Sequence, residues 1–203
     1  NIGLLNRIII DDVLLDDQSG QEMLKVTRLS AKFDIMPFFK GKISISSVQL
    51  FGFNINLRKE TPDSPPNFKF VLDAFASKDT VKKENSLDLR INSILIRRGR
   101  MSYHVLSEEE TPGKFNAKHI QLQNIIANIS LKALSKDSLN LGIKRLSLDE
   151  KASGFSLKKM SLKLVANNKQ TNIDNFTIEL PETSLKLDTI HLEYDSLKAF
   201  DRF

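Results

Sequence analysis

Histidine is the first residue type to consider as a metal ligand or general base, and the chain of 203 residues contains three, His104, His119 and His191. Each is isolated in the sequence, because none belongs to an HExxH motif, a paired-histidine motif or a histidine–aspartate spacing. His119 and His191 also fall on positions that the strand pattern described below places on the solvent-facing side. The sequence therefore predicts surface histidines and no metal site.

Acidic pairs are the second set of candidate ligands. Asp11-Asp12 and Asp16-Asp17 flank a turn-like segment, DDQSG. A calcium-binding EF-hand needs oxygen ligands at alternate positions and a glutamate at the twelfth, and that spacing is missing. We expect a hairpin turn here, because Asp and Gly favour turns. The chain has no cysteine, which excludes a disulfide scaffold, a thiolate zinc site and a cysteine nucleophile.

The segment RRGR, residues 97–100, is the strongest local basic cluster. Arg97, Arg98 and Arg100 have two interpretations, a contact with phosphate or lipid headgroups, or a solvated β-turn. We favour the turn, because a short charge run is usually a wet loop. The formal net charge of +5 is a mild excess spread along the chain, without the concentrated stripe that is typical of nucleic-acid binding.

No set of residues typical of catalysis is recognisable. The sequence has no glycine-rich phosphate loop, no GxSxG elbow and no aromatic stacking platform. We therefore predict a protein that is not an enzyme, with no cofactor, no metal and no nucleic-acid partner. Its 40% hydrophobic and 27% charged residues are typical of a folded domain. No apolar run approaches the ~20 residues of a membrane span, and we expect the chain, which opens with Asn1, to be a piece of a longer protein.

The strands that must position any site are indicated by a repeated pattern, clearest in KGKISISSVQLFGFNINLRKE, residues 40–60. Apolar residues alternate as in a strand, but the phase slips by one at Ser46-Ser47 and again at Phe51-Gly52. Written as Φ-x-Φ-x-x-Φ-x-Φ, with Φ apolar, the pattern is an internal repeat. Its nine copies span residues 8–15, 24–31, 43–50, 89–96, 115–122, 141–148, 155–162, 171–178 and 185–192. Of the 36 Φ positions only Thr171 is not apolar, and of the 36 x positions only Ile9, Leu14 and Leu95 are apolar.

The slip in phase has two structural explanations. A β-bulge would restore the apolar face and bend the strand, so nine strands bulged at one level would form a sheet folded along a crease. Alternatively, each strand could pass from one sheet of a sandwich to the other at a corner. Both arrangements give an all-β fold, and the creased sheet would have one continuously apolar and one continuously polar side.

The spacing of the copies predicts how the strands connect. The last four copies start 14, 16 and 14 residues apart, which is too close for parallel crossovers and predicts an antiparallel meander. Wider gaps leave room for one more strand around residues 101–105 and another around residues 127–131. The segment ETPDSPPN predicts a turn, and Asn67 is a suitable N-cap for a short helix near residues 68–76. This helix could plug one end of the apolar face or cover a sheet edge.

Residues 24–105 resemble the N-terminal periplasmic region of the AsmA-like and TamB (translocation and assembly module) proteins of Gram-negative envelopes. The resemblance rests on KVTRLSAKFDIMPFFKGKISISSVQLFGFNINLRKETPDSPPNFKFVLDAF followed by LDLRINSILIRRGRMSYHV. In order, these contain an alternating segment flanked by Lys and Gly, a helix start at Asn67-Phe68, and a second alternating segment that passes through Gly99. The repeats over residues 115–192 fit the long β region of the same family.

The resemblance implies one elongated region over residues 1–203, a mainly antiparallel, bulged sheet curved into a taco-like groove, with one short helix. It also implies a periplasmic protein tethered to the inner membrane by an N-terminal helix outside this chain. The implied function is lipid transport to the outer membrane, or its assembly, with a phospholipid or other acyl lipid and the outer-membrane assembly machinery as partners. The family offers no catalytic residue. The implied groove lining consists of Ile43, Ile45, Val48, Leu50, Leu89, Ile91, Ile94, Ile96, Ile120, Leu122, Leu146, Leu148, Leu157, Met160, Phe176, Ile178, Leu187 and Ile190.

Two functional hypotheses remain open from the sequence. The first is a groove that conducts lipid, since acyl chains need length and apolar contact but no specific polar partner. The second is a structural or adhesive β module whose apolar side is a closed, dry core. The exposure of the apolar side separates them, because large exposed apolar patches are rare in monomers and usually functional.

Overall fold

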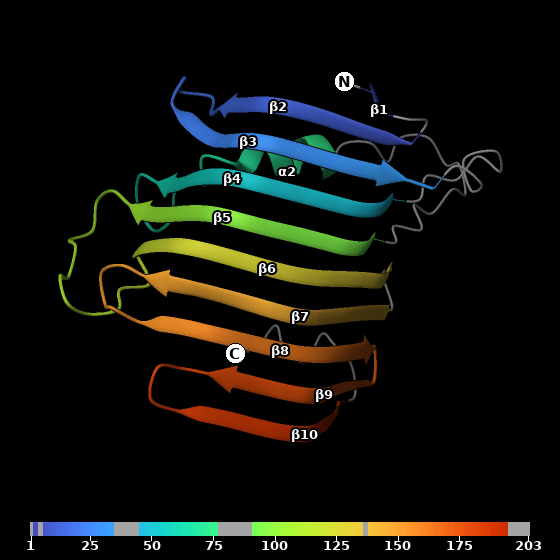
Figure 1. Cartoon of the computed structure of the whole chain (residues 1–203). Coiled ribbons are helices and arrows are strands. Elements are labelled where there is room, and N and C mark those ends of the chain that lie inside the picture. Colours follow the sequence, from blue (N-terminus) through green and yellow to red (C-terminus); the bar gives the residue numbers. More distant parts are fainter. Residues whose placement is uncertain (1, 4–5, 35–44, 77–90, 136–137, 195–203) are drawn as a thin grey trace.

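The computed structural model describes residues 2–3, 6–34, 45–76, 91–135 and 138–194, which form one open sheet with a single short helix (Figure 1). The strands are β1 (Ile2–Gly3), β2 (Arg7–Asp16), β3 (Glu22–Phe33), β4 (Ile45–Lys59), β5 (Ile91–Val105), β6 (His119–Ser135), β7 (Ser138–Glu150), β8 (Ser156–Asn167), β9 (Gln170–Glu179) and β10 (Ser184–Glu193). The helix is α2 (Lys69–Ala76), where the sequence predicts one.

The strands follow one another across the sheet in chain order, from β1 to β10. All neighbouring pairs are antiparallel except β4 and β5, which are parallel. Residues 60–90 connect that parallel pair and contain α2, as expected for a crossover. The all-β, mainly antiparallel fold is confirmed, and so is the predicted meander, which comprises β7 to β10.

The predicted extra strands are wrong. Residues 101–105 continue β5, and residues 127–131 continue β6, so each gap is filled by one long strand. The copy of the pattern at residues 115–122 is also not one strand, because β6 begins only at His119. Phe115 and Ala117 fit the alternation but lie in the connection that precedes β6. Gln123 and Asn124, which no copy of the pattern includes, form the first of several register irregularities in this strand.

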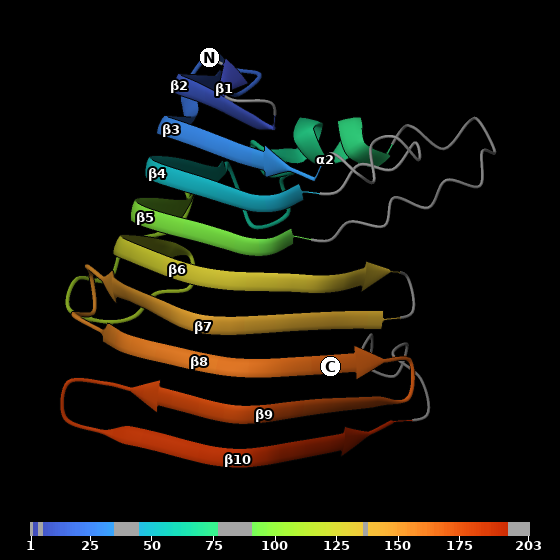
Figure 2. The same cartoon turned by 45° about the vertical axis from the view of Figure 1, so that its right-hand side comes forward.

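The crease explains the phase slips, and the sandwich does not. Within the described ranges there is a single sheet, whose strands bow along their length (Figure 2). Positive φ angles fall at the second residue of a doubled polar pair in four strands, at Asp12, Arg98, Asn124 and Asn175, and at Gly52 of the Phe51-Gly52 slip in β4. A left-handed residue turns the chain so that the apolar side chains on both sides of it face the same way.

The predicted bulge places two residues of one strand opposite one residue of the neighbouring strand. Only some of the slips have this geometry. Between β5 and β6, Ile96 pairs with Ala127 and Gly99 pairs with Ile125, so two residues of β5 oppose one of β6. Between β2 and β3 the slips of both strands coincide, and the register is the same on either side. The slips also lie at different levels along the strands, because β4 and β5 each contain two of them. The crease is therefore not one straight line.

Gly99 leaves room for the ring of Phe53 in the buried apolar cluster. Val26, Phe53 and Ile125 form the buried cluster, and a Cβ atom on Gly99 would lie 2.3 Å from the ring of Phe53. Any larger residue would have to push this ring away from its packed position. The glycine is therefore required by packing, whereas Gly52 is required by its φ of 65°.

Gly99→Ala is expected to lower the free energy of unfolding by about 1–3 kcal/mol, because the added methyl group overpacks the cluster. Gly142→Ala is the matched control, since a Cβ atom there meets only the rotatable Ser130 hydroxyl, at 2.7 Å. Urea denaturation measures both variants. Phe53→Leu in the Gly99→Ala background should recover part of the loss, and strictly additive effects would contradict the packing explanation.

Candidate functional site

Apolar residues of the pattern are aligned across the sheet in continuous rows. The first row, given by successive cross-strand pairs, is Ile10, Leu29, Leu50, Ile96, Ala127, Leu146, Met160, Ile178 and Leu185. The second row is Ile8, Ala31, Val48, Ile94, Ile129, Ile143 and Leu162. The third row is Phe33, Ile45, Ile91, Leu131, Leu141, Leu164, Ile173 and Ile190. Paired residues share a face, so the three apolar rows form one apolar surface that runs across the strands.

The first apolar row crosses nine strands, which corresponds to about 38 Å at roughly 4.8 Å between neighbouring strands. Ala127 is the one buried residue of the three rows, and the others are half-buried or exposed. At the ends of the first row, Ile10 and Leu185 are each 47% exposed. The described part of the chain therefore leaves most of this surface open, and the packed cluster of buried apolar residues, Val26, Phe53 and Ile125, is small.

The predicted groove lining lies on this surface wherever the structure describes it. Ile43 and Leu89 lie outside the described residues. Ten of the predicted residues are members of the three rows, and the remainder continue the same alternation along their strands. Pairs such as Leu148 with Leu157 and Phe176 with Leu187 extend the surface beyond the rows. The sequence pattern thus identifies which side chains share a face.

The arginine cluster occupies the opposite face, and its prediction as a β-turn is wrong. Arg97, Arg98 and Arg100 lie inside β5, at the second slip of that strand, and all three are exposed. Arg98 adopts a φ of 55° and places its guanidinium carbon 5.1 Å from the ring centroid of Phe51. An acyl chain bound on the apolar rows would lie on the other side of the sheet, so a headgroup contact with these arginines would need a lipid bound to the polar face.

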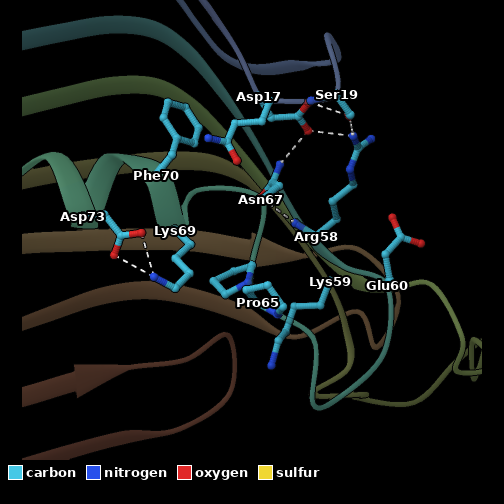
Figure 3. A pocket seen from close by; sticks show the side chains of 12 residues that line it. Asp17, Ser19, Arg58, Lys59, Glu60, Pro65, Asn67, Lys69, Phe70 and Asp73 are labelled. Carbon is cyan, nitrogen blue, oxygen red and sulfur yellow. Dashed lines mark hydrogen bonds and ion pairs between the residues drawn. The ribbon is translucent and has the colours of Figure 1, made fainter.

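A polar cluster joins the β2–β3 turn to the start of the helix, and it lines a cavity of about 260 Å³ (Figure 3). The buried Asp17 carboxylate accepts hydrogen bonds from the Ser19 hydroxyl at 2.6 Å and from Arg58 Nη2 at 2.6 Å. The backbone NH groups of Ser19 and Gln21 donate to the same carboxylate. The predicted hairpin turn is confirmed by the bond from Gly20 NH to the Asp17 carbonyl oxygen.

Asn67 belongs to this cluster and does not cap the helix as predicted. Its side-chain oxygen accepts from the backbone NH of Arg58 at 3.0 Å, and its amide donates to the Asn56 carbonyl oxygen and to Asp17. Asn67 therefore fixes the start of the helix to β4. In Figure 1 α2 lies behind β3 and β4, and in Figure 2 it stands away from the described strands, so the helix does not cover a sheet edge.

No buried side-chain nitrogen or oxygen atom of the cluster lacks a hydrogen-bond partner, which indicates an anchor. The hydrogen bond from Ser19 is the main cause that lowers the pKa of Asp17 to about 2 from 3.8, and the bonds from Gln21 and Asn67 add to it against the opposing effect of burial. A group with a lowered pKa stabilises the fold above its unfolded-state pKa, and this contribution is lost as the pH falls through the folded-state pKa.

A second buried carboxylate, Glu150, anchors the β7–β8 turn. Burial works to raise the pKa of Glu150, but hydrogen bonds from the Ser153 hydroxyl and from the NH groups of Ser153, Ala152 and Gln121 outweigh burial and lower it. The carboxylate is thus held as an ionised acceptor for backbone NH groups. It lies at the same ends of the strands as the Asp17 cluster.

The structure brings together two histidines that the sequence treats as isolated. His104 on β5 pairs directly with His119 on β6, and their Nδ1 atoms are 3.0 Å apart. Their prediction as isolated surface residues is wrong, because His119 is 7% exposed. Glu110, in the connection between the two strands, places a carboxylate oxygen within 4.0 Å of both Nδ1 atoms. The apolar repeat could have predicted that His104 lies opposite His119 only if the register between β5 and β6 had been known. His191 remains an exposed residue beside Glu193.

No protein-family model matches the sequence, and neither a curated protein nor a solved structure is significantly similar to the chain. Among the described residues there is also no helix long and apolar enough to cross a membrane.

Asp17→Asn is expected to lower the free energy of unfolding at about pH 7 by roughly 1–3 kcal/mol, because it leaves the Arg58 guanidinium without its buried counter-charge. Asp16→Asn is the control, since Asp16 is the exposed neighbour of the same charge. Because the pKa of Asp17 is about 2, the difference between wild type and Asp17→Asn should shrink as the pH falls from about 4 to about 2. Urea denaturation at both pH values measures this. A difference that does not depend on pH would show that the charge of Asp17 is unimportant.

Replacement of Arg97, Arg98 and Arg100 by Gln tests the headgroup contact. If these exposed side chains meet lipid phosphates, the triple variant should bind anionic liposomes more weakly than wild type, most clearly at low salt. Lys163, Lys169 and Lys186, replaced together by Gln, remove the same charge from exposed positions elsewhere. Equal loss in both variants would indicate an effect of net charge, and unchanged binding would exclude the contact.

Proposed function

We propose that the chain is part of a non-enzymatic bridge in the periplasm that holds lipid acyl chains on its apolar surface, and that serves lipid transport to the outer membrane or its assembly. The observation that supports this most directly is the continuity of the three apolar rows, which cross seven to nine strands and, except at Ala127, remain at least partly exposed. A phospholipid or another acyl lipid is the proposed ligand. The proposal includes membership of the AsmA-like and TamB family, because the resemblance to these proteins implies the same function.

The chemistry of the surface favours acyl chains over other ligands. The three rows contain only aliphatic residues, Met160 and Phe33, so they offer no hydrogen bond or charge by which a sugar, nucleotide or peptide backbone could be recognised. Acyl chains need only apolar contact, which a long surface supplies. At roughly 25 cal/mol for each Å² of apolar surface buried, a chain laid along a row would gain substantial free energy without any specific contact.

The direction of the rows supports movement along the surface. They run across the strands, so a chain that moves from strand to strand meets the same chemistry at each step. The opposite face carries the charged residues of the slips, among them Arg97, Lys144 and Lys158, and suits contact with water. Tethering to the inner membrane and contact with the outer-membrane assembly machinery belong to this proposal through the resemblance, and segments outside the chain would provide them.

The alternative is a structural or adhesive module with a closed, dry core. For the described residues, one sheet provides no second apolar layer, so the dry core would require an additional covering element or partner. This difference gives a direct test, because a carboxylate on a covered face costs several kcal/mol, whereas on an open face it can stay hydrated.

Val48→Asp and Ile94→Asp, made separately, place a carboxylate in the second apolar row at two residues that pair with each other. If the surface is open and holds acyl chains, each variant should unfold within about 1–2 kcal/mol of wild type, yet lose most of its bound lipid. Gln49→Asp is the control, because Gln49 is exposed on the polar face between Val48 and Leu50.

Three measurements distinguish the outcomes. Thermal melts report stability, native mass spectrometry with lipid extraction reports lipid occupancy, and complementation in the full-length protein reports envelope integrity. A folded variant without lipid supports the proposal. Unfolding of both variants would favour a covered core, since total stability is only ~5–15 kcal/mol. Normal lipid content and function in both variants would contradict the proposal.

A further inference from the structure

We propose that His104, His119 and Glu110 form a binding site for a divalent transition metal, of which Zn²⁺ is the best match. The site lies where β5 ends and β6 begins, apart from the apolar rows. The ligand atoms are Nδ1 of both histidines and one carboxylate oxygen of Glu110, which lie within 4.8 Å of one another.

The distances suit one small cation. The Nδ1 atoms are 3.0 Å apart, and the Glu110 oxygen is 3.8 Å from His104 Nδ1 and 4.0 Å from His119 Nδ1. Ligands at about 2.0–2.1 Å from a tetrahedral Zn²⁺ are roughly 3.3–3.4 Å apart. The separation of the two Nδ1 atoms needs to grow by about 0.3–0.4 Å, and the Glu110 oxygen needs to approach them by about 0.4–0.7 Å. The Glu110 side chain is 62% exposed and can move.

The orientation of His119 is already that of a metal ligand. Its Nε2 lies 2.9 Å from the carbonyl oxygen of Glu108, which can only accept, so Nε2 carries the proton and Nδ1 presents a lone pair. A ligating histidine usually donates its other ring NH to such an acceptor, which fixes its tautomer. His119 is only 7% exposed and its ring has a hydrogen-bond partner at each nitrogen, so it is held in place before any metal binds.

His104 must change its tautomer when the metal binds. Because His119 Nδ1 has the lone pair, His104 Nδ1 donates the hydrogen bond that joins the two rings. The metal replaces this proton, which returns to the ring at Nε2 through solvent, so both imidazoles remain neutral. The His104 side chain is 24% exposed, which allows this exchange with water.

The charges around the site favour a cation. Glu110 contributes a negative charge, and the nearby Lys118 is paired with Glu108 at 2.6 Å. Arg58 is the neighbour of His104 on β4, and its guanidinium is bound to Asp17 and Ser19. Two imidazole ligands favour Zn²⁺ over Mg²⁺ or Ca²⁺, which prefer oxygen. Three protein ligands leave a fourth position for water, and the bound metal would fix residues 106–118 to the ends of β5 and β6.

The test uses the full chain and Zn²⁺ alone, with Mg²⁺ as the control cation. Long-range ¹H–¹⁵N spectra resolve all three imidazoles of the chain. One equivalent of Zn²⁺ should shift Nδ1 of His104 and His119, move the His104 proton from Nδ1 to Nε2, and leave His191 unchanged. Zn²⁺ at about 100-fold over Kd should raise the melting temperature by roughly 5–10 °C, and Mg²⁺ should not.

Variants identify the ligands independently of folding. His104→Gln should weaken Zn²⁺ binding by more than about 100-fold, because even partners outside the coordination shell contribute about 10- to 100-fold. Glu110→Gln, in an exposed position, should weaken it by at least about 10-fold without changing the melting temperature of the metal-free chain. Glu109→Gln and His191→Asn are the controls and should bind as wild type does. Equal shifts of all three histidines, the absence of any shift, or unchanged affinity in Glu110→Gln would overturn the three-ligand site.

Discussion

The structure depends on strands that change phase without changing face. Side chains alternate with a period of two, so one extra residue would turn half of each strand's apolar side chains toward water. At five slips a residue with positive φ prevents this, and three of the five are Asp or Asn, which tolerate the left-handed conformation. Arg98 tolerates it poorly, and its stacking over Phe51 offsets part of the cost.

Continuous apolar rows on a single sheet leave unusually little core. The buried cluster of Val26, Phe53 and Ile125 is small, so much of the order must come from the strand ladders and from polar anchors at the strand ends. Asp17 with Arg58 and Asn67, Glu150 with its backbone donors, and the His104–His119 pair all lie at the same ends of the strands. These anchors fix the turns, where an open sheet would otherwise fray, and leave the apolar surface free of polar contacts.

The sequence predicted which face of the sheet a side chain lies on better than it predicted which residues of other strands lie beside it. Alternation in a strand is a local property, so the side of the sheet on which Val48, Ile94 or Met160 lies followed from the repeat alone. The lengths of the strands could not be predicted from the repeat. β5 and β6 each continue through a second slip, which in the sequence resembles a break between two strands. Phe115 and Ala117 satisfied the pattern by chance. The site of His104 and His119 depends on register across a connection of 13 residues, and no local pattern contains that information.

The arrangement is suited to extension. For the described elements, each strand contacts only its sequence neighbours, so the stability of one strand pair depends little on distant strands. Another bulged hairpin added beside the sheet would lengthen each apolar row by about 10 Å at roughly 4.8 Å per strand, and would need only the same pattern of residues. A closed core could not grow in this way, because each added strand would have to fit a fixed interior volume. The repeat therefore specifies a surface whose length is set by the number of strands, which is the property that the proposed bridge between two membranes would require.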